Sequence, residues 1–424
     1  MSSRRVAVVG AGMAAARLAQ QLHAHGGPTE TVVYGAEPQA PYNRALLADV
    51  IAGRHRAGSL ALPTGDAEVR TGTEVVAVDI RGRTLTLADG SREAYDDVVF
   101  ATGAEPVLPP LDGLAGAAGG LADASGCLTG ATGGLRTGLH VLRSLDDCAR
   151  LARDADTASR AVVIGGGVLG VGVARALAAR GLSVEIVHQG PHLVERHLDR
   201  RAGAALRTAL GRLGVGVHPG ERAPAPDSGP GVTLTGGRRL DADLVVLTCG
   251  VRPRTGLARA AGLPVRRGVV VDDTLACAPH TYAVGDCAEH GTTVHGLATT
   301  AWEQADVLAA RLSGAGPGAR YTGSRPMSRL TAGPVEYAAF GACGDADEEG
   351  ADVLRIGDAT RGAYKKLVLR GDRIVGAILV GDLATAGSLT RAFLTGRPVG
   401  RDPLSLLTVP PRVPSARVVE ESRT

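Results

Sequence analysis

Aromatic residues are scarce in this chain: they make up 3% of its 424 residues, whereas hydrophobic residues make up 44%. The core is therefore expected to be aliphatic and rich in alanine. A surface that stacks nucleic-acid bases on aromatic rings is not expected. The formal net charge is only +3 and no long basic run occurs, so neither nucleic acid nor an anionic membrane is predicted as a partner.

Long apolar runs are also missing, since none approaches the roughly 18 residues of a membrane span. The N-terminal stretch after Arg4-Arg5 resembles a signal peptide in composition. However, Arg17 interrupts its apolar run, and its glycines have the spacing of a nucleotide-binding turn. We therefore expect no membrane span and a cytoplasmic location.

None of the six cysteines belongs to a C-x-x-C pair. The usual sequence-local redox disulfide is therefore excluded, and nothing supports a four-cysteine iron–sulfur or zinc site. We predict no metal site. Scattered thiols fit a reducing cytoplasm, where each is expected to be a small buried apolar residue.

The chain is instead rich in glycine, and one glycine turn lies near its middle. A β-branched run ends in Gly165-Gly-Gly167-Val168-Leu169-Gly170, followed by a helical pattern and a second apolar run. This order of strand, turn, helix and strand predicts a dinucleotide site. We expect the first glycine to form the turn, Gly167 to admit a pyrophosphate, and Gly170 to let the helix pack closely. Incidental glycines in a structural βαβ unit are the alternative.

The N-terminus carries a similar pattern, in which the strand Val6–Val9 enters Gly10-Ala-Gly12-Met13-Ala14-Ala15. Glu37 follows the next strand, where an acid can accept hydrogen bonds from a ribose hydroxyl; an ordinary loop carboxylate is the alternative. Arg44 could bind a phosphate or stack on a ring, or be solvated. A later signature also repeats: Ala101-Thr102-Gly103 resembles Thr248-Cys-Gly250. Two signatures in one order indicate two copies of one domain.

The copies and the segments between them predict six regions along the chain. A Gly/Ala-rich insertion, too poor in large apolar residues to hold a fixed shape, separates the copies, and the segment after the second copy is expected to complete the first. The regions are a first domain at 1–110, the insertion at 111–139, a second domain at 140–265, the rest of the first domain at 266–316, a C-terminal domain at 317–411 and a tail at 412–424.

Several segments resemble the two-dinucleotide flavoproteins of the pyridine nucleotide-disulfide oxidoreductase type, without the redox disulfide. The similarity is greatest to the flavoprotein portion of NAD(P)H-dependent nitrite reductase large subunits. Ferredoxin and rubredoxin reductases share the layout. The segments are Gly35-Ala-Glu-Pro-x-x-x-Tyr42-Asn-Arg44, Tyr282-Ala-Val-Gly-Asp-Cys-Ala-Glu289, Trp302-Glu-Gln-Ala305, Ala363-Tyr-Lys-Lys-Leu and Gly376-Ala-Ile-Leu-Val-Gly-Asp382.

The resemblance implies an α/β fold with two Rossmann-like FAD/NAD(P)-binding domains, the second inserted in the first, plus a C-terminal α+β domain. It implies FAD in the first copy and NAD(P)H in the second. A helix starting near Leu297 would direct its positive end at the flavin. Trp302 would lie beside the ring, or else be a core aromatic. The implied cofactor residues are Gly10, Gly12, Met13, Ala14, Glu37, Arg44, Val76 (adenine), Ala101, Thr102, Gly103, Gly165, Gly167, Val168, Leu169, His188, Gly250, Gly285, Asp286 (ribityl chain) and Trp302.

Three positions depart from the relatives. A Glu and a Lys that pair near the nicotinamide in several relatives are replaced by Gly172 and Asp49. His188 stands where an acid would select NADH, so the choice between NADH and NADPH stays open. No cysteine lies near Tyr42, where the resembling NADH oxidases and coenzyme A disulfide reductases carry their reactive thiol, which argues against peroxide or disulfide chemistry.

The function expected from this resemblance is an FAD-dependent NAD(P)H oxidoreductase. It would pass electrons to a separate redox partner, either a ferredoxin-like protein or a nitrite reductase catalytic subunit. No catalytic side chain is expected, since the cofactors carry the chemistry. The sequence has no iron–sulfur and siroheme portion, so nitrite reduction would need a partner. Alternatives are a flavin-binding regulatory or interaction subunit with a decayed nicotinamide site, and a peroxide-forming oxidase. A homodimer is compatible with the resemblance.

Overall fold

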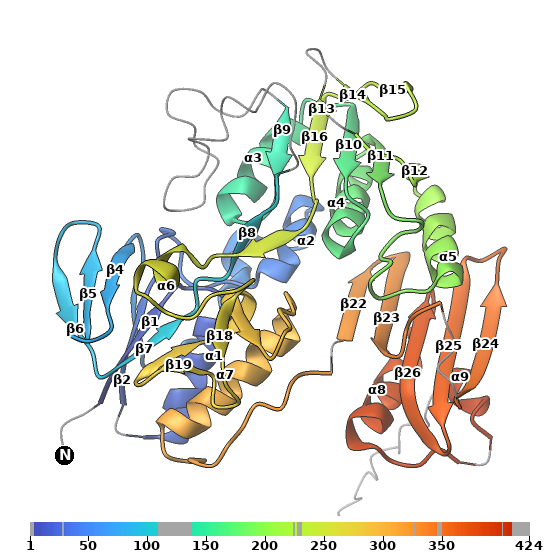
Figure 1. The fold of residues 1–424 in the computed structure, drawn as a ribbon. Helices are drawn as coiled ribbons and strands as arrows, with labels where there is room; N and C mark the ends of the chain where they lie inside the picture. Colours follow the sequence, from blue (N-terminus) through green and yellow to red (C-terminus); the bar gives the residue numbers. More distant parts are fainter. Residues whose placement is uncertain are drawn as a thin grey trace, which may run out of the picture. The chain divides into compact units, whose positions relative to one another are not determined.

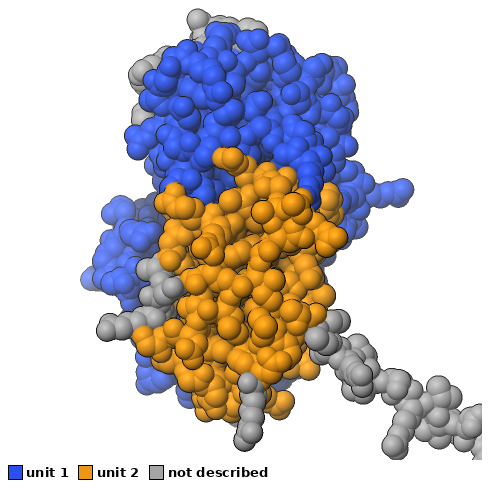
Figure 2. Space-filling view, turned by 90° about the vertical axis from the view of Figure 1, so that its right-hand side faces the viewer, with its two compact units in different colours: residues 1–195, 210–326 blue, residues 196–209, 327–424 orange. Residues whose placement is uncertain are grey.

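The computed structural model describes residues 4–27, 29–108, 138–223, 225–226, 231–325, 327–345, 350–400 and 402–408. The expected tail, and all but the last two residues of the expected insertion, lie outside these ranges. The chain groups into two compact units (Figure 2). One unit combines Met1–Glu195 with Leu210–Pro326, and the other combines Arg196–Ala209 with Met327–Thr424. The six regions expected from the sequence stay a prediction.

The first sheet of the larger unit has six strands (Figure 1). Its central strand β1 is followed by the helix α1 (Met13–His25), which packs against the later helix α7 (Ala298–Leu312). All neighbouring strands are parallel except β19, which pairs antiparallel with β20. The order is β19 (Ala276–Ala278), β20 (Thr281–Ala283), β7 (Asp97–Phe100), β1 (Arg4–Val9), β2 (Thr29–Tyr34) and β3 (Glu68–Arg70).

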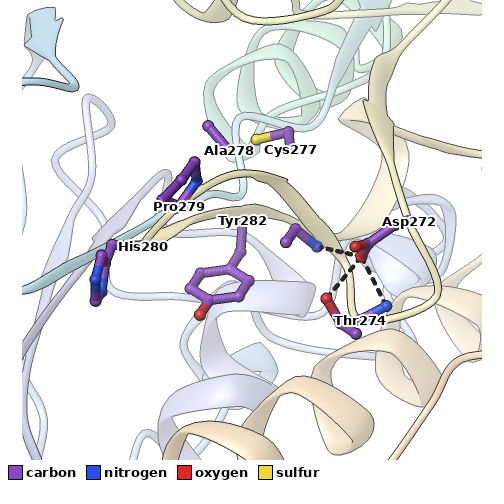
Figure 3. A pocket seen from close by; sticks show the side chains of 8 residues that line it. Asp272, Thr274, Cys277, Ala278, Pro279, His280 and Tyr282 are labelled. Atoms are coloured by element: carbon purple, nitrogen blue, oxygen red, sulfur yellow. Dashed lines mark hydrogen bonds between the residues drawn. The ribbon is translucent and has the colours of Figure 1, made fainter.

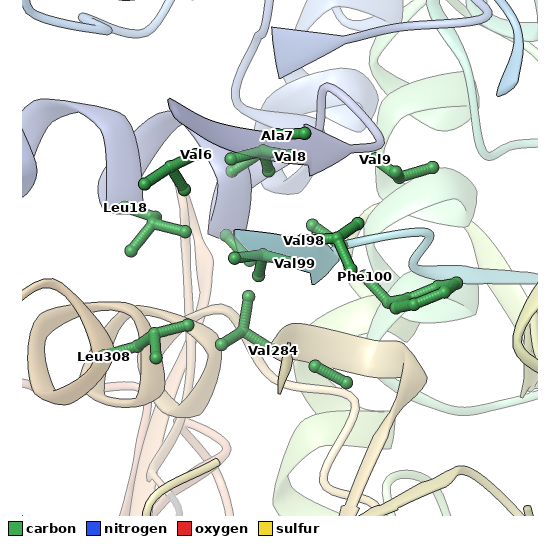
Figure 4. Packing of buried hydrophobic residues seen from close by; sticks show 14 of the residues in the cluster. Val6, Ala7, Val8, Val9, Leu18, Val98, Val99, Phe100, Val284 and Leu308 are labelled. Carbon is green, nitrogen blue, oxygen red and sulfur yellow. The ribbon is translucent and has the colours of Figure 1, made fainter. Parts of the chain in front are cut away.

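Continuous apolar strands and the apolar faces of the two helices form the core of this sheet (Figure 4). Val6 and Val8 of β1 and Val98 of β7 are buried, as are Leu18 of α1 and Leu308 of α7. Fully apolar strands are typical of parallel sheets covered on both faces. The core is aliphatic, as the scarcity of aromatic residues predicts.

The second sheet has five strands, all parallel, and β10 occupies the position that β1 occupies in the first. The helices α3 (Leu145–Ala155) and α4 (Val168–Ala179) belong to this part of the chain. Because β19 and β20 return to the first sheet, the second domain is inserted in the first, which confirms the expected fold class. The order is β12 (Val215–Pro219), β11 (Ser183–His188), β10 (Arg160–Ile164), β16 (Leu244–Leu247) and β9 (Leu139–Val141).

The remaining elements of the larger unit are short. The crossing strands β8 (Ala104–Pro106) and β17 (Val251–Pro253) pair antiparallel. The others are β4 (Val75–Asp79), β5 (Thr84–Leu87), β6 (Arg92–Ala94), β13 (Ala225–Pro226), β14 (Val232–Thr233), β15 (Arg239–Leu240), β18 (Val269–Val271), β21 (Ala288–His290), α2 (Leu47–Ile51), α6 (Gly256–Ala260) and the 3-10 turns η1 (Arg44–Leu46), η2 (Ala57–Leu60) and η3 (Gly285–Cys287).

The smaller unit is an antiparallel five-stranded sheet with helices, as expected for an α+β domain. It also contains most of α5 (Arg200–Gly211). Its core includes Phe340 and Phe393, whose ring centroids lie 4.9 Å apart. The order is β22 (Met327–Ala332), β23 (Val335–Gly341), β26 (Arg373–Val380), β25 (Ala363–Arg370) and β24 (Asp352–Asp358), and the helices α8 (Ala386–Thr395) and α9 (Ser405–Thr408) follow.

Both lysines of the chain are buried in this smaller unit. Lys365 Nζ donates to the Leu407 carbonyl at 2.8 Å, and Lys366 Nζ donates to the Gly344 carbonyl at 2.8 Å. Asp199, before α5, accepts the Tyr364 hydroxyl at 2.8 Å and lies 3.7 Å from Lys366 Nζ. Buried charges need such partners, so these groups join α5 to the C-terminal sheet.

Among the residues that the structure describes, no helix combines the length and the apolar character needed to cross a membrane.

Leu308→Ala should destabilise the larger unit, because its side chain is buried between α7 and the first sheet. Loss of a buried leucine costs about 2–5 kcal/mol of unfolding free energy. Leu394→Ala, at an exposed position, should change it by less than about 0.5 kcal/mol. Chemical unfolding followed by circular dichroism measures both, and equal losses would contradict the packing described.

Candidate functional site

The turn after β1 requires glycine at Gly10. Its φ is +109°, and a Cβ there would lie 2.3 Å from the Ala101 carbonyl oxygen. An L-residue with a side chain cannot meet both conditions. The Gly10 N–H donates to the Tyr34 carbonyl at 2.8 Å, which holds the turn against the end of β2.

Gly12, two residues on, faces open space. A Cβ there would meet nothing within 4 Å, and no side chain caps the helix that Met13 and Ala14 begin. The first backbone N–H groups of α1 are therefore available to an anion, and the helix dipole favours one. This arrangement fits the pyrophosphate of a dinucleotide.

The second turn repeats this geometry. Gly165 has φ +116° and would place a Cβ 2.3 Å from the Thr248 carbonyl oxygen, whereas a Cβ on Gly167 would meet nothing within 4 Å. Gly170 would place a Cβ 1.9 Å from the Gly165 carbonyl oxygen, so it permits close packing of helix on strand. Val168 and Leu169 form the first turn of α4, which has no side-chain cap. Gly165 thus forms the turn and Gly170 lies against the strand, and the contact of Gly167 with a pyrophosphate stays a prediction.

Glu37 and Arg44, which the sequence analysis treated separately, form an ion pair. The Tyr42 hydroxyl donates to the second Glu37 oxygen at 2.6 Å, and the Arg44 guanidinium lies 4.7 Å from the Tyr42 ring centroid. Burial raises the pKa of Tyr42, which stays a neutral donor. Tyr42 was not among the expected site residues, because it occurs only as one position of the resembling segment and no spacing rule assigns it a contact.

Arg143 continues this network toward Asp286. Its Nη2 donates to Asp286 Oδ2 at 2.6 Å, and its carbonyl accepts from Arg44 Nη1 at 2.8 Å. Glu37 at the predicted ribose end and Asp286 at the predicted ribityl end are thus joined through two arginines, Arg44 and Arg143. Arg143 belongs to no motif, so sequence reasoning missed it.

Thr102 and Gly103, two of the implied cofactor residues, contact a third arginine, Arg254. The Thr102 hydroxyl donates to the Arg254 carbonyl at 2.7 Å, and the Arg254 N–H donates to the Gly103 carbonyl at 2.9 Å. Burial lowers the pKa of the Arg254 guanidinium, and Arg44 and Arg143 lower it further against the opposing effect of Glu105. An anionic group would relieve this repulsion. The Gly250 carbonyl accepts from the Val107 N–H at 2.9 Å, beside the paired strands β8 and β17.

The start of α7 lies close to the start of α1. The Gly285 N–H donates to Gln304 Oε1 at 2.7 Å, and a Cβ on Gly285 would lie 3.0 Å from Ala14 Cβ. The Thr300 hydroxyl, in the first turn of α7, is buried and has no partner among the described residues. Trp302 is half-buried in a small pocket that Met13 also lines.

Val76 is the extra residue of a β-bulge between β4 and β5. Its side chain is 46% exposed. Because a bulged residue leaves the ladder, its backbone groups are available to another partner. The contact of Val76 with an adenine ring stays a prediction.

His188 points inward instead of toward the surface. It is 7% exposed, its Nδ1 accepts from the Gly166 N–H at 3.1 Å, and its Nε2 lies 2.8 Å from Glu195 Oε2. His188 therefore supports the glycine turn from behind, and its sequence position alone does not reveal this. Glu195 was not among the expected site residues.

Gly172 and Asp49, the other two positions that depart from the relatives, lie where α4 and α2 face each other. A Cβ on Gly172 would meet only Ala48 Cβ, at 3.5 Å, so α4 faces α2 there. Asp49 accepts from Arg175 Nη2 at 2.5 Å, and Arg175 is buried. The ion pair between Asp49 and Arg175 therefore joins α2 and α4.

The thiols of the described cysteines are poorly suited to redox chemistry. Burial raises the pKa of Cys148 to about 11 and that of Cys277 and Cys343 to about 12, and it also raises the pKa of Cys249 and Cys287. All five are free thiols. Cys127 lies outside the described residues.

A shallow pocket at the β19–β20 hairpin contains none of the expected cofactor residues (Figure 3). Asp272, Cys277, His280 and Tyr282 are among its lining residues. No group of three or more His, Cys, Asp or Glu side chains within the described ranges could hold a metal ion.

A family profile described as pyridine nucleotide-disulphide oxidoreductase matches residues 4–305, and a rubredoxin NAD+ reductase C-terminal domain profile matches residues 326–395. The nitrite reductase [NAD(P)H] of Bacillus subtilis (strain 168) is 33% identical over 92% of this chain and 47% of its own length. The chain spans about half the length of several curated relatives it matches.

A relative of similar length is the ferredoxin reductase component of chlorobenzene dioxygenase from Cupriavidus sp. (strain PS12). It is 33% identical over 91% of this chain and 92% of its own length. Among solved structures, the covalent putidaredoxin reductase–putidaredoxin complex superposes with a TM-score of 0.80 at 26% identity, covering 96% of both chains.

Gly170→Ala and Gly167→Ala should separate folding from nucleotide binding. The Gly170 variant places a methyl group against a backbone oxygen and should lose about 3 kcal/mol or more of unfolding free energy. The Gly167 variant should lose about 1 kcal/mol or less but bind NADH and NADPH at least about tenfold more weakly, because its methyl group occupies the pyrophosphate space. Thermal unfolding and calorimetric titration measure these effects; the reverse pattern would contradict the assigned glycine roles.

The thiols of native Cys127→Ser protein should react slowly with Ellman's reagent at pH 8, because the raised pKa values keep them protonated. Denatured protein should react rapidly at all five remaining cysteines. Rapid labelling of the native variant would contradict the burial described.

Proposed function

Because the chain belongs to the pyridine nucleotide-disulphide oxidoreductase family, we propose that it passes electrons from NAD(P)H to a separate redox protein. The chain is an oxidoreductase of a family that uses FAD and NAD(P)H. The observation that carries the proposal is the pair of glycine turns, each opening an uncapped helix N-terminus to an anion. Two such sites in one unit suit two dinucleotides.

We assign FAD to the first turn and NAD(P)H to the second. Gly12 leaves room for the FAD pyrophosphate and Gly167 for that of the nicotinamide nucleotide. When bound, the flavin supplies the exchange between two-electron and one-electron transfer, and the protein supplies position and electrostatics.

The charged network around Arg44 and Arg143 would orient the first cofactor. Glu37 would accept hydrogen bonds from the adenosine ribose, Arg44 would face the phosphates, and Asp286 would accept from the ribityl chain. In the structure these carboxylates are held by the two arginines. Because the two arginines already hold these carboxylates, binding would need little rearrangement of them, which favours affinity.

The start of α7 would lie at the pyrimidine end of the flavin. A helix N-terminus carries roughly half a positive charge, which would stabilise negative charge on the reduced ring. The unpartnered Thr300 hydroxyl adds a polar group there. Trp302 would lie beside the ring and limit access of water.

The acceptor that we propose is a ferredoxin-like protein or the catalytic part of a nitrite reductase. The relatives carry both kinds of name, and one solved relative is a complex of a reductase with putidaredoxin. The five described cysteines are free thiols whose pKa values are raised by burial, which argues against a disulfide acceptor. We place the reaction in the cytoplasm, where such thiols persist, and a homodimer is the oligomeric state to test first.

Anaerobic mixing with NADH and with NADPH should bleach the bound flavin with at least one of them. If neither does, the reductase proposal fails and the regulatory-subunit alternative replaces it. Brisk oxygen uptake without any added acceptor would instead indicate an oxidase. Stopped-flow absorbance near the flavin maximum provides the measurement.

Gly172→Glu should change nicotinamide affinity or the rate of flavin reduction by about fivefold, because its carboxylate would enter the α2–α4 interface that holds Asp49. Like charges at contact distance cost on the order of 1 kcal/mol near water. Gly172→Ala adds only a Cβ that fits against Ala48 and should leave both quantities unchanged. Unchanged values in the Glu variant would mean that this face of α4 does not border the nicotinamide.

A further inference from the structure

The position that usually selects between NADH and NADPH holds no acid, because β11 ends in the inward-pointing His188. Such an acid normally accepts hydrogen bonds from the adenosine ribose. A carboxylate nevertheless lies at this end of the strand. It belongs to Glu195, whose Oε2 is 2.8 Å from His188 Nε2.

The hydrogen bonds of His188 define its tautomer. Its Nδ1 accepts the Gly166 N–H at 3.1 Å, so the ring proton must be on Nε2 in the neutral imidazole. Nε2 then donates to the Glu195 carboxylate. The imidazole is thus hydrogen-bonded to both the glycine turn and the Glu195 carboxylate, and it holds the carboxylate in place relative to the turn.

The backbone before Glu195 is held to the same turn. Val194 has φ +54°, which is rare for a β-branched residue, and its N–H donates to the Gly166 carbonyl at 2.9 Å. Backbone in this region persists only where surrounding contacts enforce it. Both backbone polar groups of Gly166 are therefore occupied, the N–H by the His188 side chain and the carbonyl by the loop that ends at Glu195.

The carboxylate remains accessible beside Gly190. The Glu195 side chain is 35% exposed, and Oε1 has no hydrogen-bond partner among the described residues. A Cβ on Gly190 would lie 3.1 Å from Glu195 Cδ and 2.6 Å from His188 Nε2. A side chain at 190 would thus disturb the pair.

We propose that Glu195 is the specificity-determining residue of the second nucleotide site. One carboxylate oxygen is held by His188, and the other accepts from the 2′-hydroxyl of the adenosine ribose. The same charge repels the 2′-phosphate of NADPH, so the protein prefers NADH. This inference rests on the proposed binding of NAD(P)H at the second glycine turn.

Two other charged residues lie near this strand end. Glu221 donates its backbone N–H to the His188 carbonyl at 3.2 Å, but its carboxylate faces Thr235, 3.5 Å from the hydroxyl. Arg222 is exposed and is the side chain that would favour a 2′-phosphate. Because His188 holds the Glu195 carboxylate at this strand end, we expect the site to prefer the ribose 2′-hydroxyl of NADH over the 2′-phosphate of NADPH.

Calorimetric titration of the flavoprotein with ADP-ribose and with 2′-phospho-ADP-ribose tests the inference without turnover. The wild type should bind ADP-ribose at least about tenfold more tightly. Glu195→Gln keeps an acceptor for His188 but removes the charge, and it should narrow that ratio by about tenfold. Glu221→Gln is the matched control and should leave the ratio unchanged.

Tighter binding of the 2′-phosphate by the wild type would overturn the inference, and loss of that preference in Arg222→Gln would assign specificity to the arginine. A ratio that Glu195→Gln leaves unchanged would also overturn it. Failure of the proposed function would appear differently: neither NADH nor NADPH would reduce the flavin, whatever the binding ratio of the two ADP-ribose probes.

Discussion

A backbone carbonyl oxygen approaches the first glycine of each turn so closely that no Cβ could be accommodated. The oxygen belongs to Ala101 in the first domain and to Thr248 in the second, and both would lie 2.3 Å from a Cβ. Ala101 follows β7 and Thr248 follows β16, the strands beside β1 and β10. The contact therefore joins the end of this neighbouring strand to the turn between the central strand and its helix. Because the helix starts at this contact, its free N–H groups face the same edge of the sheet. Both glycine turns, each with its uncapped helix N-terminus, therefore depend on the same steric condition.

Local chemistry explains why the glycine turns were predictable from the sequence. Their spacing, the apolar strands on either side and the repetition of Ala101–Gly103 as 248–250 all lie within short segments. Fold class follows from the order of such segments. Arg143 could not be found in this way, because its ion pair with Asp286 depends on a tertiary approach between distant parts of the chain. No spacing rule contains that information.

Side-chain direction is a second property that the sequence does not reveal. His188 occupies the position of a ribose-binding acid, but it supports the Gly166 peptide from within. The choice between inward and outward depends on the loop that returns to place Glu195 beside it. The sequence position of His188 therefore predicts where β11 ends, but it does not predict which residue faces the ligand. Likewise, Asp199 begins a helix of the second repeat yet bonds Tyr364 of the C-terminal sheet.

Gly172 and Asp49, which the resemblance places where a Glu and a Lys would pair, lie on the facing helices α4 and α2. An ion pair between α2 and α4 persists, with the acid on α2 and the base, Arg175, on α4. Removing only one partner of a buried pair leaves an uncompensated charge and is costly, so Asp49 and Arg175 must be kept or lost together. The connection between the two domains is thus maintained three residues along α4, while the surface at Gly172 carries no charge. A charge introduced at Gly172 would therefore act on Asp49 and on the interface between α2 and α4, as well as on any nicotinamide bound beside it.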